Sequence, residues 1–162
     1  MKKIFCIISI WISCILISSC VGYEPIFSSK ALQFKIAKYS LNGDEQLSNQ
    51  IYKKLKMISD GESESNNTKE INISIQVFKN KKTTAKNTSG KILEYRIELK
   101  ANILVKDFIS NEILLEHTFD SFSSYKVQDQ HSETIKLENK TTEDLVNKVF
   151  DDLLIKLTEN II

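Results

Sequence analysis

The sequence predicts an α+β domain in which two helices pack on one face of a four-stranded sheet, in the order β-α-β-β-β-α. Two observations lead to this fold class. Four segments alternate apolar and polar residues, which is typical of strands with one buried face. Two other segments repeat apolar residues every three or four positions, which is typical of amphipathic helices. Placing both helices on the same side of the sheet buries all of these apolar faces together.

The first strand and the first helix are adjacent in the chain. Leu32, Phe34 and Ile36 alternate with polar residues and predict a half-buried strand. We expect a helix to begin at Asn42, which can cap it, with Glu45 three residues later as in a capping box. The apolar stripe of this helix consists of Leu47, Ile51, Leu55 and Ile58.

Two strands joined by a basic segment follow a polar loop at 59–69. Alternation over 71–77 predicts one strand, and alternation over 93–105 predicts a second, which is the clearest signal in the chain. The segment between them, 79–90, is polar and basic. We therefore predict a hairpin-type loop there that is longer than the usual few residues.

A fourth strand and a long helix complete the domain. Alternation from Ile113 to Phe119 predicts the strand, and the pattern slips between Phe119 and Phe122, which predicts a bulge or a bend. Either Ser132 or Thr141 is suited to cap the helix, and we favour the earlier site. Its apolar stripe consists of Ile135, Thr142, Val146, Val149, Leu153 and Leu157, widened by Leu145, Phe150 and Leu154.

The N-terminus has the pattern of an export signal. Two lysines precede an uncharged, Ile-rich stretch that is shorter than the roughly 20 apolar residues needed to span a bilayer. The stretch ends in Ile17-Ser18-Ser19-Cys20, which resembles the lipobox of bacterial lipoproteins, where the Cys thiol takes a diacylglyceryl thioether. We expect a signal peptide at 1–19, a tether lipidated on Cys20 at 20–30, and a folded domain at 31–162. The alternatives are an ordinary signal peptide with an incidental cysteine, or a signal anchor.

Composition excludes several classes of protein. Without residues 1–19 the chain has 20 basic and 21 acidic residues, a formal net charge of −1, so the basic field of a general nucleic-acid binder is absent. Cys20 is then the only cysteine, which excludes an internal disulfide. The two histidines, His117 and His131, lie far apart, and no Gly-rich phosphate loop or catalytic triad is visible. We expect no metal, no cofactor and no enzymatic activity, with His117 as a packed side chain.

The basic segment is open to two interpretations. Lys79, Lys81 and Lys82 belong either to a solvated hairpin or to a surface that contacts anionic groups such as lipid phosphates. Arg96 and Lys100 lie on the polar face of the long strand, interleaved with Glu94 and Glu98. This mixture of charges favours a solvated or protein-facing surface over a strong anion site.

Two motifs resemble the LPS-assembly lipoprotein LptE family. The first is Gly22-Tyr23-Glu24-Pro25-Ile26-Phe27, which Val21 separates from the expected lipidation site at Cys20, and the second is Phe122-Ser123-Ser124-Tyr125 before the last helix. The resemblance implies a non-enzymatic lipoprotein on the periplasmic face of the outer membrane that plugs an LptD-like β-barrel and helps it assemble. It also implies contact with lipopolysaccharide, for which the candidates are Lys79, Lys81, Lys82, Arg96 and Lys100.

Two other classes of protein share the anchor and a small α+β domain. One is a free-standing periplasmic lipoprotein adaptor that regulates cell-wall synthesis or serves an efflux complex. The other is a hydrolase, for which no nucleophile constellation is visible in the sequence.

Overall fold

The computed structural model describes residues 34–59 and 68–161. The expected signal peptide, Cys20 and the tether therefore lie outside the described residues. The predicted order of elements is confirmed. No helix in the described part of the chain is long and apolar enough to cross a membrane. The elements are β1 (Phe34–Gly43), α2 (Glu45–Ser59), β2 (Lys69–Lys86), β3 (Ile92–Asp107), β4 (Ile113–Lys126) and α3 (His131–Ile161).

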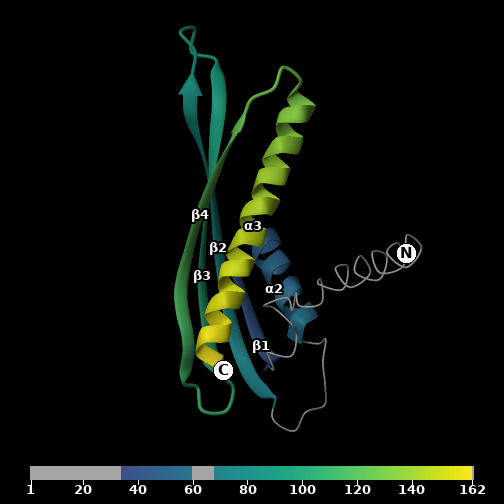
Figure 1. Ribbon diagram of the computed structural model, residues 1–162, viewed down its shortest axis with the longest axis vertical. Coiled ribbons are helices and arrows are strands. Elements are labelled where there is room, and N and C mark those ends of the chain that lie inside the picture. Colours follow the sequence, from purple (N-terminus) through teal and green to yellow (C-terminus); the bar gives the residue numbers. More distant parts are fainter. Residues whose placement is uncertain (1–33, 60–67, 162) are drawn as a thin grey trace, which may run out of the picture.

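The sheet has the order β1-β2-β3-β4, and both helices lie on one of its faces (Figure 1). β1 and β2 pair in parallel, because α2 lies between them in the chain and carries it back, whereas β2, β3 and β4 are antiparallel. β1 pairs with β2 only as far as Val77. We call β2 residues 71–79 with β3 residues 99–107 the base half of the sheet, and 80–86 with 92–98 the hairpin half.

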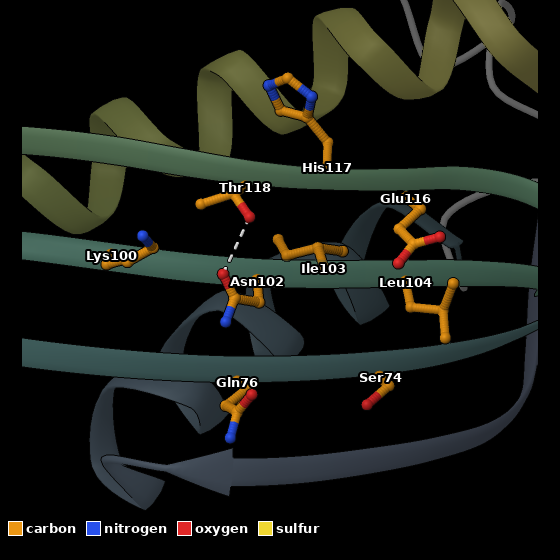
Figure 2. A pocket seen from close by; sticks show the side chains of 9 residues that line it. All are labelled: Ser74, Gln76, Lys100, Asn102, Ile103, Leu104, Glu116, His117 and Thr118. Atoms are coloured by element: carbon orange, nitrogen blue, oxygen red, sulfur yellow. Dashed lines mark hydrogen bonds between the residues drawn. The ribbon is translucent and has the colours of Figure 1, made fainter.

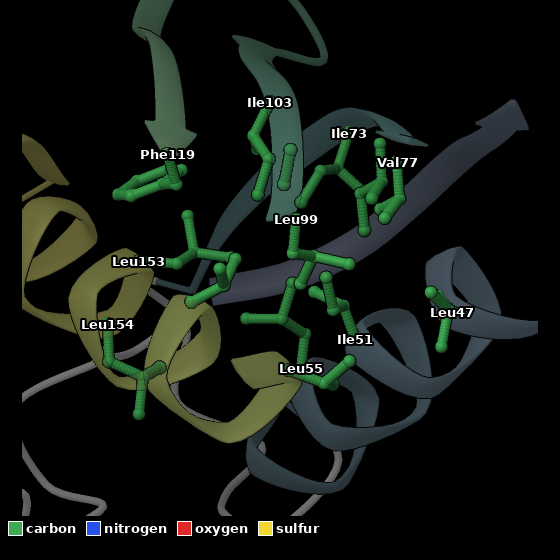
Figure 3. Close-up of a cluster of buried hydrophobic side chains, with 14 of the residues drawn as sticks. Leu47, Ile51, Leu55, Ile73, Val77, Leu99, Ile103, Phe119, Leu153 and Leu154 are labelled. Carbon is green, nitrogen blue, oxygen red and sulfur yellow. The ribbon is translucent and has the colours of Figure 1, made fainter. Parts of the chain in front are cut away.

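The hydrophobic core lies between the base half and the two helices (Figure 3). Alternate residues of the strands point into it, and the predicted stripe of α2 supplies three fully or nearly buried side chains, with Ile58 partly buried. Burying each Leu or Ile side chain contributes about 1.5–3 kcal/mol, so this layer holds the helices to the sheet. Its members include Ile51, Leu55, Ile71, Ile75, Val77, Leu99, Ile103, Val149, Leu153 and Leu157.

The helix α2 begins two residues later than predicted. β1 continues to Gly43, and the cap is Asp44, whose Oδ1 accepts a hydrogen bond from the Leu47 amide at 3.1 Å. Gly43 has a φ of 77° and lies against the Val77 carbonyl, leaving no room for a side chain. The positive φ redirects the chain from strand to helix, so the prediction of Asn42 as the cap is wrong.

The predicted loop at 79–90 is wrong as well. β2 runs on to Lys86, and the connection to β3 is only Asn87 to Lys91. Alternation of apolar residues stops at Val77, because the strand continues beyond the part of the sheet that both helices cover. Its backbone stays paired with β3, so polar side chains are tolerated there.

The bulge predicted before Phe122 does not occur. β4 pairs with β3 without interruption from Leu115 to Lys126, and Ser121 and Tyr125 are buried in phase with Phe119. Phe122 points to the opposite face, where it is 64% exposed. The small serines on the inward face gave no apolar signal, which made the alternation look broken.

The last helix begins early, as predicted, at His131. Ser132 lies inside the helix instead of capping it, because the backbone carbonyl of Gln130 accepts the first hydrogen bonds. The stripe is buried from Thr142 onward, but Ile135 is 43% exposed. The first turns of α3 lie over the hairpin half, where few apolar side chains are available to cover them (Figure 1).

Candidate functional site: the polar side chains of the sheet

The strand alternation divides the five predicted lipopolysaccharide contacts between the two faces of the sheet. Lys79 and Lys81 are in phase with buried Val77 and therefore lie on the helix side. Lys82, Arg96 and Lys100 lie on the outer face, which no described helix covers. The five residues thus form two separate groups and no single basic cluster.

The cations of the outer face have acidic or aromatic neighbours. Lys82 Nζ lies 2.6 Å from Oε2 of Glu98, which is two residues along β3 from Arg96, the register partner of Lys82. The Arg96 guanidinium lies 4.7 Å from the centroid of the Phe122 ring, and its Nε is buried without a hydrogen-bond partner among the described residues. This part of the outer face is consequently close to neutral and offers flat, partly apolar contacts beside paired charges.

A shallow polar hollow of about 760 Å³ lies in the base half of the sheet, on the same outer face (Figure 2). Its side chains come from β2, β3 and β4, and the amide of Asn102 accepts a hydrogen bond from Thr118 Oγ1 at 2.9 Å. Lys100 borders the hollow, 3.9 Å from Asp120. Amide, hydroxyl and charged groups are mixed here, so the surface suits a wet polar partner more than an apolar one. The other polar lining residues are Ser74, Gln76, Glu116 and His117.

On the helix side, Lys81 belongs to a cluster of side chains that joins β2, β3, β4 and α3. Its ammonium forms an ion pair with Glu138 and lies 4.2 Å from the centroid of the Tyr95 ring. The Tyr125 hydroxyl donates a hydrogen bond of 2.8 Å to the same Glu138 oxygen. This cluster fastens the first turns of α3 to the hairpin half.

The pKa values of the cluster reflect its contacts. Partial burial raises the pKa of Glu138, but the hydrogen bonds from Lys81 and Tyr125 and the charge of Lys81 outweigh it, so this pKa lies below its usual range. Burial lowers the pKa of Lys81, and the contacts with Glu138 and Tyr125 reverse the change, leaving this pKa raised. Both groups stay charged at neutral pH, so the ion pair holds the first turns of α3 to the hairpin half.

Lys79 borders a second hollow, about 580 Å³ in volume, between the two helices. Lys53 and Lys54 of α2 and Glu143 of α3 line it as well. Lys79 therefore lies between the helices, far from the outer-face residues with which it was grouped.

The two histidines do not form a site. His117 is exposed on the edge strand β4, its ring 4.6 Å from that of Phe119, so the prediction of a packed histidine is wrong. Its ring points away from the outer hollow (Figure 2). Within the described residues no cluster of His, Cys, Asp or Glu is arranged to hold a metal ion.

Sequence reasoning missed Tyr125 and Glu138 as partners of Lys81. Glu138 lies 57 residues from Lys81, and nothing in the local pattern links them. Tyr125 carried a usable signal, because it continues the alternation of Phe119 once the intervening serines are counted as inward-facing.

Solved structures of bacterial lipoproteins have the same fold. No protein-family profile matches the sequence, and no curated protein sequence matches it. Rare lipoprotein B from Shewanella oneidensis superposes with a TM-score of 0.51 at 11% identity, covering 76% of this chain and 98% of that one. A minor lipoprotein from Acinetobacter baumannii superposes with a TM-score of 0.54 at 16% identity, covering 78% and 94%.

A lipoprotein B from Nitrosomonas europaea gives a TM-score of 0.53 at 13% identity, covering 80% of this chain and 88% of that one. Identities in this range establish the fold. The chain therefore has the two-layer α+β fold found in these bacterial lipoproteins.

Proposed function

We propose that this protein is an outer-membrane lipoprotein of the LptE type, which plugs the LptD β-barrel, helps it assemble and assists delivery of lipopolysaccharide to the cell surface. The role is non-enzymatic. The observation that carries the proposal is the coincidence of a lipobox at Cys20 with a fold found in bacterial lipoproteins, rare lipoprotein B among them. Neither feature alone distinguishes this role from other anchored domains.

The outer face of the sheet supports the plugging role. A plug inside a wet barrel needs a polar surface of mixed charge on a rigid support. The hollow around Asn102 and the ion pair between Lys82 and Glu98 provide such a surface on three hydrogen-bonded strands. We propose this face as the one that meets the barrel wall.

Affinity purification from membranes tests the partnership. A tagged chain extracted in mild detergent should bring down an outer-membrane β-barrel, and the Cys20→Ser variant should recover much less of it because the protein loses its membrane anchor. Recovery of the chain without any barrel would contradict the plugging role.

Depletion separates this role from that of a free-standing adaptor. Loss of surface lipopolysaccharide with mislocalised barrel supports the proposal. A cell-shape defect with normal surface lipopolysaccharide would instead indicate an adaptor for cell-wall synthesis.

Lipopolysaccharide contact is tested on the outer-face cations. Removing charge in Lys82→Ala with Lys100→Ala should weaken binding of lipopolysaccharide, and the loss should be larger at low salt. The matched control removes the same charge from α2, in Lys53→Ala with Lys56→Ala. If the two double variants weakened lipopolysaccharide binding equally, Lys82 and Lys100 would be solvated residues without a specific contact.

A further inference from the structure

The two ends of the sheet differ in the chemistry of their turns. At one end, the β2–β3 hairpin turn is polar from Asn87 to Lys91. At the other end, the β3–β4 turn presents Ile109, which is 86% exposed and is the most exposed large apolar side chain of the described residues. Isolated exposed apolar residues are common on protein surfaces, whereas Ile109 belongs to a group of them.

The β3–β4 turn is held in a defined shape. The Asp107 carboxylate accepts hydrogen bonds from the amides of Ile109 at 2.9 Å and Ser110 at 2.8 Å, and Asn111 adopts a φ of 60°. The Phe108 amide bonds to the carbonyl of Glu70 at 2.9 Å, which ties the turn to the start of β2. Ile109 is therefore held outward by a well-bonded turn.

Other exposed apolar side chains lie at the same end. Ile113, at the start of β4, is 52% exposed, and Met57, in the last turn of α2, is 73% exposed. α2 follows β1 in the chain and runs back along the sheet to the start of the parallel strand β2. It therefore ends at this end of the domain (Figure 1).

The charges of this end are mixed, with a small excess of lysines. Lys35 and Lys38 of β1, Lys69 of β2 and Lys106 of β3 lie there, and Lys38 contacts the Phe108 ring from 5.6 Å. Acidic groups at the same end include Glu70, Asp107, Glu112 and Glu159, the last in the final turn of α3 (Figure 1). Apolar side chains with flanking lysines are the composition of a surface that meets lipid headgroups.

The same end receives the chain from Cys20. β1 begins there at Phe34, level with Lys69, 14 residues after Cys20. Fully extended, those 14 steps span at most about 50 Å. The hairpin end lies 17 residues further along β2, or about 56 Å at the rise of a strand. A membrane-bound Cys20 therefore brings Ile109 to the membrane easily, whereas the distance from the start of β1 to the hairpin turn exceeds the length of even a fully extended tether.

We propose that the end of the domain formed by the β3–β4 turn, with Ile109 at its tip, Ile113 at the start of β4 and Met57 in the last turn of α2, rests on the lipid bilayer that holds the anchor. This contact orients the free lipoprotein with its hairpin half pointing away from the membrane. The inference rests on lipidation of Cys20, which is part of the proposed function, but not on the barrel partnership.

Tryptophan fluorescence of the full, lipidated chain tests this orientation. The only tryptophan, Trp11, lies within the expected signal peptide, so Ile109→Trp gives the mature chain a single fluorophore at the proposed contact. The matched control is Thr88→Trp, at the exposed tip of the opposite turn. Both proteins are reconstituted in vesicles of phosphatidylethanolamine and phosphatidylglycerol whose acyl chains are brominated.

The expected result is strong quenching and a blue-shifted emission for Ile109→Trp, with neither change for Thr88→Trp. Equal quenching of the two variants, or none in either, overturns the proposal. Shielding of the Ile109→Trp fluorophore only after a protein partner is added also overturns it, because the turn would then be a protein contact. The intact mass of each preparation reports acylation of Cys20, so failure of the anchor is distinguished from failure of the orientation.

Discussion

In the base half of the sheet, both helices meet a continuous layer of buried Ile, Leu and Val side chains. Beside the hairpin half only α3 continues (Figure 1), and the buried side chains of the strands there are Ile97 and, on the adjoining part of β4, Tyr125. The helix is fastened to this half by the contacts of Glu138 with Lys81 and Tyr125. Apolar burial thus stabilises one half, and a few polar contacts position the other.

This difference matters because the two kinds of contact have different strengths and different sensitivities to pH and salt. Core burial contributes about 1.5–3 kcal/mol for each large side chain. A hydrogen bond contributes about 1 kcal/mol net, and an exposed ion pair less. The hairpin half is therefore the part of the described domain where the outer surface can change with little effect on folding.

The largest effect is expected in the base half. Leu153→Ala removes a fully buried side chain of α3 and should lower the free energy of unfolding by about 2–5 kcal/mol. Denaturant unfolding of the full chain measures this loss. Ile155→Ala, at a 44% exposed position of the same helix, is the control and should cost less than about 0.5 kcal/mol. Similar losses for both would mean that α3 does not pack on the sheet through this stripe.

A smaller loss is expected from two glycines with similar backbone angles. Gly43→Ala and Gly90→Ala both place a side chain at positive φ, which costs roughly 1–2 kcal/mol. Gly43→Ala should cost more, because its new Cβ also meets the Val77 carbonyl, which accepts a hydrogen bond of 2.7 Å from the Asp44 amide, whereas Gly90 faces open space. Equal midpoints of thermal unfolding for the two variants would show that the β1–α2 junction adjusts freely.

The sequence was informative wherever apolar periodicity operates. It predicted the order of the elements and the stripe of α2, because burial forces these residues into regular spacing. It failed where other forces act. The extension of β2 to Lys86 depends on backbone pairing with β3, and the partnership of Lys81 with Glu138 depends on tertiary contact. The five candidate cations divide between two faces of the sheet, because β2 continues as a strand to Lys86 and a strand sends its neighbours to opposite faces.

The fastening of the hairpin half is tested by Glu138→Gln. The variant should lose about 1 kcal/mol of unfolding free energy at pH 7, because Lys81 loses its charged partner while Tyr125 keeps an acceptor. The pKa of Glu138 is lowered in the folded state, so its stabilisation is present above the ordinary carboxyl pKa and is lost as the pH falls through the lower folded value. The difference between the two proteins should accordingly shrink in acid. Glu143→Gln, at an exposed position on the same helix, is the control, and an equal loss there would contradict the fastening role.

The smallest effect on stability is expected on the outer face. Lys82→Ala breaks the pair with Glu98, but both side chains are more than one-third exposed, so unfolding free energy should fall by less than about 0.5 kcal/mol. The loss should vanish at high salt, where exposed charges are screened. If the same variant nevertheless reduces recovery of the barrel in affinity purification, the outer face is an interaction surface and not a structural one. A loss of stability as large as that of Glu138→Gln would instead make Lys82 part of the fastening, and the contrast between the two faces of the hairpin half would be wrong.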